Sequence, residues 1–463
     1  MRIETDSLGP VEVPDQALWG AQTQRAIANF CFSGLVPFSS YVQATALVKQ
    51  AAANVNTRLG LLDPQLGGAI AETASAIARG EYADQFVVDP YQAGAGTSHN
   101  MNLNEVIANL ANRELGAALG SYKPIHPNDH VNMAQSTNDV IPTATRIALA
   151  LQLPQLLLAI DEMTHGLEAK AAEFDDVLKA GRTHLQDAVP VRLGQEFGAY
   201  AAALRHDRER LNNALAHVRR LGIGGTATGT GLNSHPRYHS EMITELSAIT
   251  GVPFKSAGNL FEAMQNAAGD LLEVSTSLRS LAVSLTRINN DLRLLSSGPS
   301  NGLAEITLPA LQPGSSIMPG KVNPVMPEAI TMVCFRVIGN DQTALMAAQA
   351  GQLELNVFVP VLAHVTLESL QLLTNGVRSF TALCLLGIGV NRAHCQSYAE
   401  RTSSLVTALN PYIGYAAAAK VAQESLSRGV SIRQVVFEHH LMTPDQLDEV
   451  LNLRDMTEPG IPG

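Results

Sequence analysis

Apolar residues recur in steps of three and four along the middle of this chain. Between residues 271 and 295 they form a seam whose mean period is about 3.5 residues. The seam consists of Leu271, Val274, Leu278, Leu281, Leu285, Ile288, Leu292 and Leu295. This pattern predicts a long helix that packs along its length against nearly parallel neighbours, as in a bundle with left-handed twist.

Other segments combine alanine, leucine, glutamine and glutamate with the same spacing, which favours amphipathic helices. These segments are residues 40–59, 66–79, 103–117, 143–174, 192–219, 239–250, 326–347 and 361–386. Pro154 is expected to kink or interrupt the segment 143–174, because proline removes a helical hydrogen bond. Strand signals are sparse, and only residues 1–13 suggest a short hairpin, around Gly9 and Pro10. The pattern therefore predicts a mainly α protein.

Polar joints that contain glycine or proline separate the predicted helices. They are residues 86–102, 122–142, 181–190, 220–236 and 312–327. At 463 residues the chain is too long for one ordinary hydrophobic core, so about two to three domains are expected. We predict a mixed, mostly helical N-terminal domain (1–138), a central helical-bundle domain (139–392) and a small C-terminal helical domain (393–463).

Composition narrows the range of partners and locations. Hydrophobic residues make up 46% of the chain and charged residues 16%, as in a packed globular protein. The formal net charge is −11 without a basic block, which argues against nucleic acid and anionic membrane as partners. No long apolar run predicts a membrane span, and the first residues show no secretory signal. The four cysteines form no C-x-x-C pair, which fits a reducing cytoplasm.

The joint at 312–327 contains the densest group of reactive side chains. Its centre, residues 314–324, reads GSSIMPGKVNP. The glycines and prolines prevent a continuous helix or central strand, and they surround two hydroxyls, one ammonium and one carboxamide. A generic Ser-Ser-Lys loop is most often a surface turn, but the full string is far more specific and indicates a catalytic or binding loop.

Three further joints carry polar clusters beside predicted helices. They are GAGTSHNMN (94–102), QSTND (135–139) and GRTHLQD (181–187). The first offers hydroxyls and free backbone N–H groups suited to an anion at a helix N-terminus. Each cluster alone is explained by helix capping or, for His184, by a structural histidine. The occurrence of four such loops in one chain favours a shared functional site.

Two other patterns do not support a site. Gly222-x-Gly224-x-x-Ala227 matches a loose dinucleotide fingerprint, but it follows a polar helical run and not a buried strand. His126 and His130 have i, i+4 spacing, but Pro127 breaks the first turn and no further ligands accompany them. We therefore expect neither a cofactor nor a metal.

Together the loops resemble those of the fumarase/aspartase superfamily. The 314–324 string resembles its signature, and residues 94–104, 126–139 and 181–196 resemble its other characteristic blocks. The resemblance covers nearly the whole chain. It implies a three-domain helical subunit and a homotetramer whose core contains about twenty helices. It also implies small dicarboxylate substrates, and active sites that each draw residues from three subunits.

The resemblance also implies a role for residues in each loop. Ser315 would be the general base, on a loop that closes over the substrate. The β-carboxylate would be bound by Thr97, Ser136, Thr137 and Ser316, and the α-carboxylate by Lys321 and Asn323. Asn138, Thr183 and His184 would surround the amino group, and Glu328 would pair with His184.

Within the superfamily, several positions resemble the members that remove ammonia from L-aspartate. Thr137 and Ala95 stand where the members that hydrate fumarate usually carry serine, and GQLELN (351–356) has the form found in the deaminating members. Thr183 and His184 occur in both groups, so hydration of fumarate to L-malate is the alternative. Cleavage of argininosuccinate or adenylosuccinate is less favoured, as is a catalytically silent assembly protein.

Overall fold

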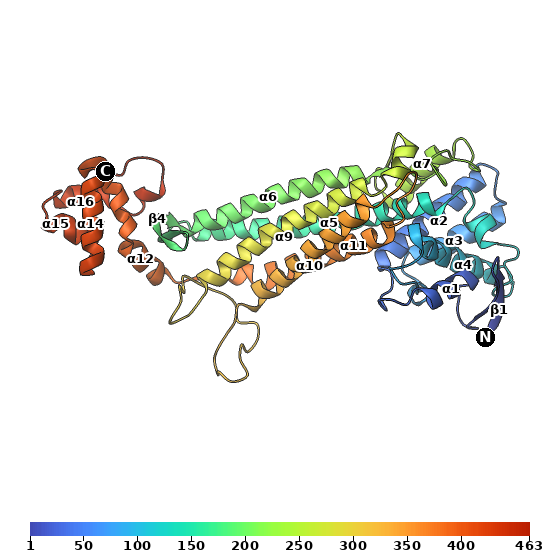
Figure 1. Cartoon of the computed structure of the whole chain (residues 1–463), viewed down its shortest axis with the longest axis horizontal. Coiled ribbons are helices and arrows are strands. Elements are labelled where there is room, and N and C mark those ends of the chain that lie inside the picture. Colours follow the sequence, from blue (N-terminus) through green and yellow to red (C-terminus); the bar gives the residue numbers. More distant parts are fainter. The chain divides into compact units, whose positions relative to one another are not determined.

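The computed structural model describes residues 1–463 and is mainly helical, as predicted (Figure 1). Its longest helices have at least 25 residues each. They are α5 (Thr137–Glu173), α6 (Leu193–Val218), α9 (Gly269–Leu295), α10 (Val325–Gln349) and α11 (Val359–Leu383). The predicted seam lies within α9, and all of its members are buried. The heptad pattern therefore identified a helix whose apolar stripe is covered by its neighbours.

The chain separates into two compact units, each built from three segments. Unit 1 comprises Met1–Leu158, Asp207–Ala282 and Val333–Thr374. Unit 2 comprises Ala159–His206, Val283–Met332 and Asn375–Gly463. The predicted domain boundaries lie beside the starts of α5 and of α12 (Arg392–Arg401), and the division into three domains stays a prediction.

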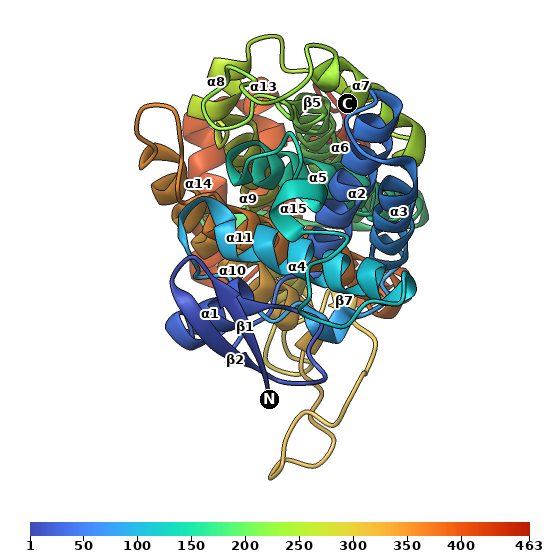
Figure 2. The ribbon, with the colours of Figure 1, turned by 90° about the vertical axis from the view of Figure 1, so that its right-hand side faces the viewer.

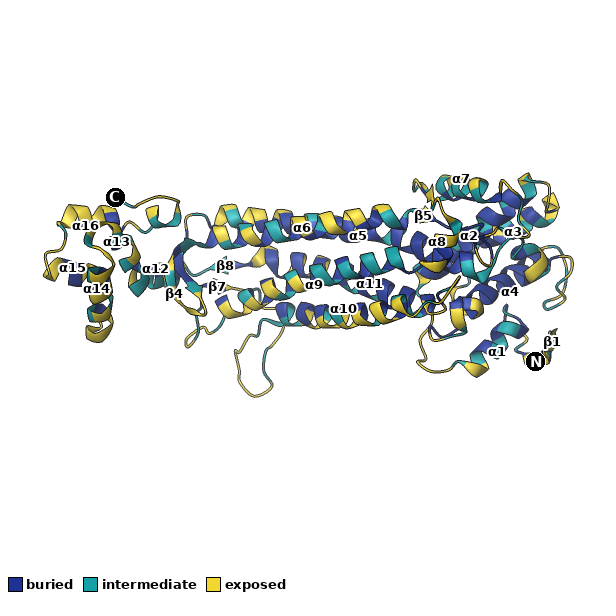
Figure 3. Ribbon diagram, turned by 45° about the horizontal axis from the view of Figure 1, so that its top comes forward, coloured by how far each residue is buried: buried dark blue, intermediate teal, exposed yellow.

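The N-terminal part of unit 1 packs short helices around one core. The hairpin of β1 (Arg2–Asp6) and β2 (Gly9–Val13) lies against α1 (Ala21–Asn29), as Figure 2 shows. This hairpin was predicted, but it turns at Ser7 and Leu8 and not at Gly9 and Pro10. Around the core lie α2 (Ser39–Arg58), α3 (Pro64–Ala78) and α4 (Thr97–Glu114). Figure 3 shows α4 buried over most of its length.

Polar contacts tie the unit 1 portions of the long helices together. Asp341 of α10 accepts a hydrogen bond from Ser275 Oγ (2.8 Å) and pairs with Arg279 (2.7 Å), both on α9. Asn340 of α10 donates to Ser369 Oγ of α11 (3.0 Å). Unit 1 is completed by α7 (Tyr238–Thr250), α8 (Leu260–Gln265), β5 (Arg220–Leu221) and β6 (Lys255–Ser256).

Unit 2 contains a β-hairpin and the C-terminal helices. The hairpin consists of β3 (Leu178–Thr183) and β4 (Gln186–Arg192), and a smaller pair consists of β7 (Ile306–Thr307) and β8 (Gly389–Val390). The C-terminal helices are α12, α13 (Asn410–Ile413), α14 (Tyr415–Arg428), α15 (Ile432–Glu438) and α16 (Pro444–Val450). A core that includes Leu409, Val435 and Leu447 holds α14–α16 together.

A second hairpin was not predicted, since only residues 1–13 suggested one. The joint 181–190 forms the turn and flanking strands of the β3–β4 hairpin. Pro154 was expected to kink or interrupt its helix; α5 continues through both Pro142 and Pro154, so the helix is not interrupted, and a kink stays a prediction. Helix α5 is also the one helix that is long and apolar enough to cross a membrane, but 72% of its apolar window is buried within the protein.

Candidate active site

The segment between β7 and α10 forms a long loop without regular structure (Figure 1). Residues 314–323 close on themselves at a narrow base within this loop. The Gly314 N–H donates to the carbonyl of Lys321 (2.8 Å), and Asn323 Nδ2 donates to the carbonyl of Gly314 (2.6 Å). These bonds define a flap, residues 314–323, whose two ends are fixed while its middle is exposed.

Ser315 lies at the start of the flap, and its hydroxyl oxygen faces two backbone donors. Ser315 Oγ accepts hydrogen bonds from the N–H groups of Ile317 (3.2 Å) and Met318 (2.9 Å). Backbone donors on a hydroxyl oxygen stabilise its ionised form more than its neutral form. Ser315 is half-buried, whereas Ser316 and Lys321 are exposed. The flap therefore places two backbone donors on the Ser315 oxygen, an arrangement that serine side chains form in local turns.

We predict that Gly314→Ala impairs catalysis by opening the base of the flap. A Cβ at this position would lie 2.4 Å from the carbonyl oxygen of Lys321, which is backbone and cannot rotate away. Because displacement of a reacting group by about 1 Å can cost about 100-fold in rate, kcat/KM is expected to fall by about that factor. Steady-state kinetics would measure the change. Gly68→Ala is the control, since a Cβ at this exposed position meets no atom within 4 Å; equal losses in both variants would contradict the role of the Gly314 contact.

The first carboxylate-binding residue predicted in unit 1 lies where α4 begins. Ala95 and Gly96 adopt left-handed backbone conformations (φ 60° and 90°), which turn the chain into the helix. The Ala95 N–H donates to the carbonyl of Val357 (2.9 Å), so the turn is anchored to the segment before α11. Thr97 is the first helical residue and is exposed, with its hydroxyl 3.4 Å from the Gly94 carbonyl. A hydroxyl at a helix N-terminus suits an anionic ligand.

Ser136, Thr137 and Asn138 lie at the N-terminus of α5. The Ser136 hydroxyl accepts from the Asn138 N–H (3.2 Å), and the Ser136 N–H donates to Asp139 Oδ1 (2.9 Å). This reciprocal arrangement resembles a capping box, in which Ser136 and Asp139 each satisfy a backbone N–H group at the start of α5. Asn138 Nδ2 donates to the carbonyl of Ala227 (2.8 Å). The cap therefore holds all three side chains at one helix end.

Asp139 also joins this helix end to the glycine-rich segment that follows α6. Its Oδ2 accepts hydrogen bonds from the N–H groups of Gly224 (2.9 Å) and Thr226 (3.0 Å). The carboxyl group is fully buried, and this burial raises its pKa to about 6 despite the three backbone donors and the charge of Lys49. The N–H groups of Gly224 and Thr226 thus bind a buried carboxyl group, which gives this glycine-rich segment a structural role beside the start of α5.

In unit 2, Thr183 and His184 lie at the tip of the β3–β4 hairpin. The two turn residues, His184 and Leu185, both have positive φ (55° and 57°), a conformation that usually requires asparagine and glycine. Backbone strain of this kind is often retained at functional sites. Both Thr183 and His184 are exposed. The hairpin therefore presents an imidazole and a hydroxyl at a rigid, strained turn.

A buried ion-pair network holds strand β3 of this hairpin. Glu305 is 0% exposed, and it pairs with Arg182 Nη1 (2.9 Å) and Lys179 Nζ (3.3 Å) of β3. Lys179 also pairs with Glu196 of α6 (2.8 Å). The sequence analysis did not identify these residues. The only available signal was an acid within the apolar segment 303–306, which is a weak pattern.

The predicted site residues are thus distributed over both units. Unit 1 contains Thr97, Ser136, Thr137 and Asn138, and unit 2 contains Thr183, His184, Ser315, Ser316, Lys321, Asn323 and Glu328. Within unit 2, no hydrogen bond or ion pair joins Glu328 to His184. The predicted Glu328–His184 pair and the assignment of these residues to one site therefore stay predictions.

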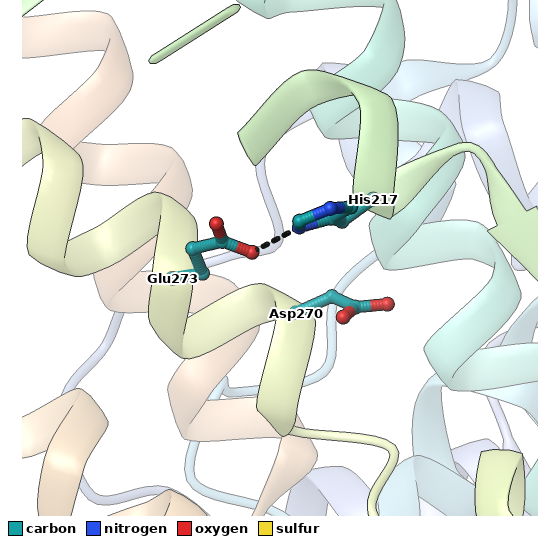
Figure 4. A group of neighbouring side chains, drawn as sticks. All are labelled: His217, Asp270 and Glu273. Carbon is teal, nitrogen blue, oxygen red and sulfur yellow. Dashed lines mark hydrogen bonds and ion pairs between the residues drawn. The ribbon is translucent and has the colours of Figure 1, made fainter. Parts of the chain in front are cut away.

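One group of side chains outside these loops has the composition of a metal site. His217, Asp270 and Glu273 place ligand atoms within 4.8 Å of one another (Figure 4). Both oxygens of Asp270 are already held by guanidinium groups, from Arg146 (2.6 Å) and Arg220 (3.0 Å). Two neighbouring positive charges disfavour a further cation. We therefore interpret the group as an ion-pair network between helices.

Comparison with known proteins supplies independent information. The lyase family model matches residues 9–339, and the model for the C-terminus of fumarase C matches residues 405–458. The chain is 47% identical to an aspartate ammonia-lyase of Bacillus subtilis, over 100% of this chain and 97% of that protein. It is 45% identical to a class II fumarate hydratase of Ralstonia nicotianae, over 96% and 97%. A fumarate lyase:delta crystallin from Brucella melitensis, solved bound to cobalt, superimposes with a TM-score of 0.95 and 48% identity, over 99% and 100%.

Proposed function

The chain belongs to the fumarase/aspartase superfamily of lyases, and we propose that it acts as an aspartate ammonia-lyase. The reaction converts L-aspartate reversibly to fumarate and ammonium. The observation that carries this proposal is the environment of Ser315, whose hydroxyl oxygen is held by two backbone N–H groups of the flap. Full-length similarity to aspartate ammonia-lyases supports the choice of substrate.

The difficult step is removal of a proton from C3 of aspartate. This carbon is only weakly acidic, because its neighbouring carboxylate already carries a negative charge. The carbanion becomes accessible when its charge moves onto the oxygens of the β-carboxylate, which gives a dianionic aci-carboxylate. Hydrogen-bond donors that already point at those oxygens stabilise the extra charge, and one such donor is typically worth about 3–4 kcal/mol.

Neutral hydroxyl groups suit the β-carboxylate site that we propose. Thr97, Ser136, Thr137 and Ser316 donate without adding net charge, and their hydroxyl rotors can adjust as charge develops. The α-carboxylate stays an ordinary anion throughout, so a fixed cation is sufficient there. Lys321 and Asn323 fill that role through a charge-assisted contact and an amide donor.

Ser315 acts as the base in this proposal, and it must be close to ionised when the flap is shut. The N–H groups of Ile317 and Met318 stabilise the alkoxide, and exclusion of water by flap closure strengthens both contacts. Asn138, Thr183 and His184 surround the departing amino group, and Glu328 orients His184. Once the C3 proton is removed, the carbon–nitrogen bond breaks and ammonia leaves as the double bond of fumarate forms.

Hydration of fumarate is the alternative reaction, because it proceeds through the same carbanion. Residues around the leaving group that occur in both types of enzyme do not distinguish them. Thr137, Ala95 and the segment 351–356 favour the ammonia-lyase. Ala95 is buried at the turn into α4, two residues before Thr97, so its difference from serine changes the packing beside the proposed carboxylate site.

We predict that the purified protein forms fumarate from L-aspartate and not from L-malate. Ultraviolet absorbance of fumarate follows each reaction in a separate assay, with L-aspartate or L-malate as the single substrate. The Ser315→Ala variant serves as the control for contaminating enzymes. We expect turnover of at least about 1 per second with aspartate, the lower end of ordinary enzyme rates. Rapid formation of fumarate from malate alone would reverse the assignment.

We further propose that the protein is a cytoplasmic homotetramer whose active sites each use residues of three subunits. Helix α10 leaves Met332, Phe335 and Met346 exposed, an apolar surface that suits a bundle shared between subunits, and the proposed site residues divide into separate groups. Three of the four cysteines are buried as free thiols, as expected in a reducing compartment. Light scattering coupled to size-exclusion chromatography tests the assembly; a monomeric mass with full activity would contradict it.

A further inference from the structure

A buried ammonium group lies next to the loop that carries Ser136 and Thr137. Lys49 of α2 is 0% exposed, and its Nζ donates to Asn132 Oδ1 (3.0 Å) and Gln135 Oε1 (2.9 Å). No carboxylate forms an ion pair with it in the described chain. A buried charge without an ion-pair partner is costly, so its retention calls for an explanation beyond packing.

The ammonium group fixes the orientation of two neighbouring amides. Since an ammonium can only donate, the Asn132 oxygen must face Lys49. The same oxygen accepts from Asn100 Nδ2 (3.1 Å), which fixes the orientation of the Asn100 amide in turn. Asn100 Nδ2 then donates to Thr137 Oγ1 (3.3 Å). The result is a directed series of hydrogen bonds from Lys49 through Asn132 and Asn100 to Thr137.

This series determines where the hydroxyl proton of Thr137 points. Because Thr137 Oγ1 already accepts a hydrogen bond from Asn100, its own proton is directed away from that amide. In the proposed site the available acceptor is the β-carboxylate of the substrate. The Asn132 amide is held in the same orientation by its Nδ2, which donates to the Gln135 carbonyl (3.2 Å), and its oxygen also accepts from Asn104 Nδ2 (3.2 Å). Loss of the ammonium would remove the one charged donor of this group and weaken the orientation of the Asn100 amide and of the Thr137 hydroxyl.

The charged groups around Lys49 do not fully compensate its positive charge, so a further negative charge nearby would be stabilised. Asp139 of α5 acts on Lys49 electrostatically, but its oxygens are engaged by the N–H groups of Ser136, Gly224 and Thr226. His99 of α4 is neutral, because burial lowers its pKa to about 3. Burial also lowers the pKa of Lys49 to about 7, with Asp139 opposing the shift. A second negative charge on a bound ligand would favour the ammonium form.

We propose that Lys49 is a positioning residue that directs the Thr137 hydroxyl proton toward the β-carboxylate and supplies a buried positive charge for the dianionic intermediate. This inference rests on the proposed function, since it assigns Thr137 to the β-carboxylate. Lys49 does not touch the substrate in this arrangement. Its effect is therefore expected on the intermediate, which carries the extra charge, more than on the ground state.

Two inhibitors separate those states. Succinate resembles the substrate, with an ordinary carboxylate at each end, whereas the nitronate of 3-nitropropionate has a planar C=N group with a formal negative charge on each of its two oxygens, as the C=C(O⁻)₂ group of the aci-carboxylate does. In Lys49→Met we expect the affinity for the nitronate to fall about 100-fold, the effect of losing one preorganised stabilising group. The affinity for succinate is expected to change only a few-fold, and kcat to fall with little change in KM. Competition kinetics and calorimetry measure these quantities.

Lys170→Met is the matched control, since Lys170 is also buried but pairs with Glu173 (2.9 Å) and the Ile388 carbonyl (2.8 Å). Its ratio of the two affinities is expected to equal that of the wild type. Lys49→Gln, which retains a donor but no charge, decides the outcome if Lys49→Met does not fold. Parallel weakening of both inhibitors in the Lys49 variants would show a purely structural role and overturn the inference. A wild-type protein that binds both inhibitors equally would instead overturn the proposed function itself.

Discussion

Ser315→Ala is expected to lower kcat by about 10³- to 10⁴-fold, the contribution of a positioned general base. The substitution removes the only atom of the flap that we assign to proton abstraction, and it leaves Ile317 and Met318 without their common acceptor. Because both N–H groups lie in an exposed part of the flap, water can replace the lost oxygen. Folding and assembly should therefore be unchanged.

The loss should appear as a defect in proton transfer and not in binding. Aspartate binding by the variant, measured by calorimetry, should remain within a few-fold of the wild type, because none of the proposed carboxylate ligands is altered. Exchange of the C3 proton with deuterated solvent should fall in parallel with kcat. Ser296→Ala, another half-buried serine of unit 2, is the control. Near-normal exchange in Ser315→Ala would remove Ser315 from the role of base.

The helices could be predicted from the sequence because their signal is repetitive. Helices such as α9 and α11 present a stripe of apolar residues over many turns, so an error at one position does not change the assignment. Pro154 shows the limit of local rules. Its effect on a single hydrogen bond was outweighed by the packing of a helix of 37 residues, most of whose apolar window is buried.

The loops could be identified as functional, but their geometry could not be predicted. The β3–β4 turn was missed because His184 and Leu185 replace the asparagine and glycine by which such turns are usually recognised. The two N–H groups on Ser315 Oγ depend on the course of the whole flap, which no spacing rule describes. Residue types thus indicated where chemistry occurs, while the backbone determines what each side chain can do.

Buried charges were the least predictable feature. Lys49 looks like an ordinary polar residue of an amphipathic helix, since a lysine usually extends its amine to solvent. Only its three-dimensional neighbours show that it is fully enclosed. Glu305 was equally hidden, because its partners Lys179 and Arg182 lie more than a hundred residues earlier in the chain. Neither residue belongs to a motif. Glu305 nevertheless pairs with Arg182, which precedes Thr183 and His184, and Lys49 binds Gln135, which precedes Ser136.

Glu305→Ala is expected to lower the free energy of unfolding by about 3–5 kcal/mol, the usual cost of removing one partner from a buried ion pair. The carboxylate is 0% exposed, and its loss leaves Lys179, itself 1% exposed, with only Glu196 as an acidic partner. Arg182 would lose its ion pair directly beside Thr183 and His184. The substitution should therefore also loosen the tip of the β3–β4 hairpin and reduce kcat.

Urea unfolding at a fixed protein concentration measures this loss, because the stability of an oligomer depends on concentration. Glu305→Gln should cost less, since its amide oxygen can still accept from one of the two cations. Asp176→Ala is the control, because its pair with Arg392 is exposed on both sides and such pairs contribute less than about 1 kcal/mol. If Glu305→Ala and Asp176→Ala were equally stable, the Glu305 network would not hold the hairpin, and the orientation of His184 would have to be set by contacts from another subunit.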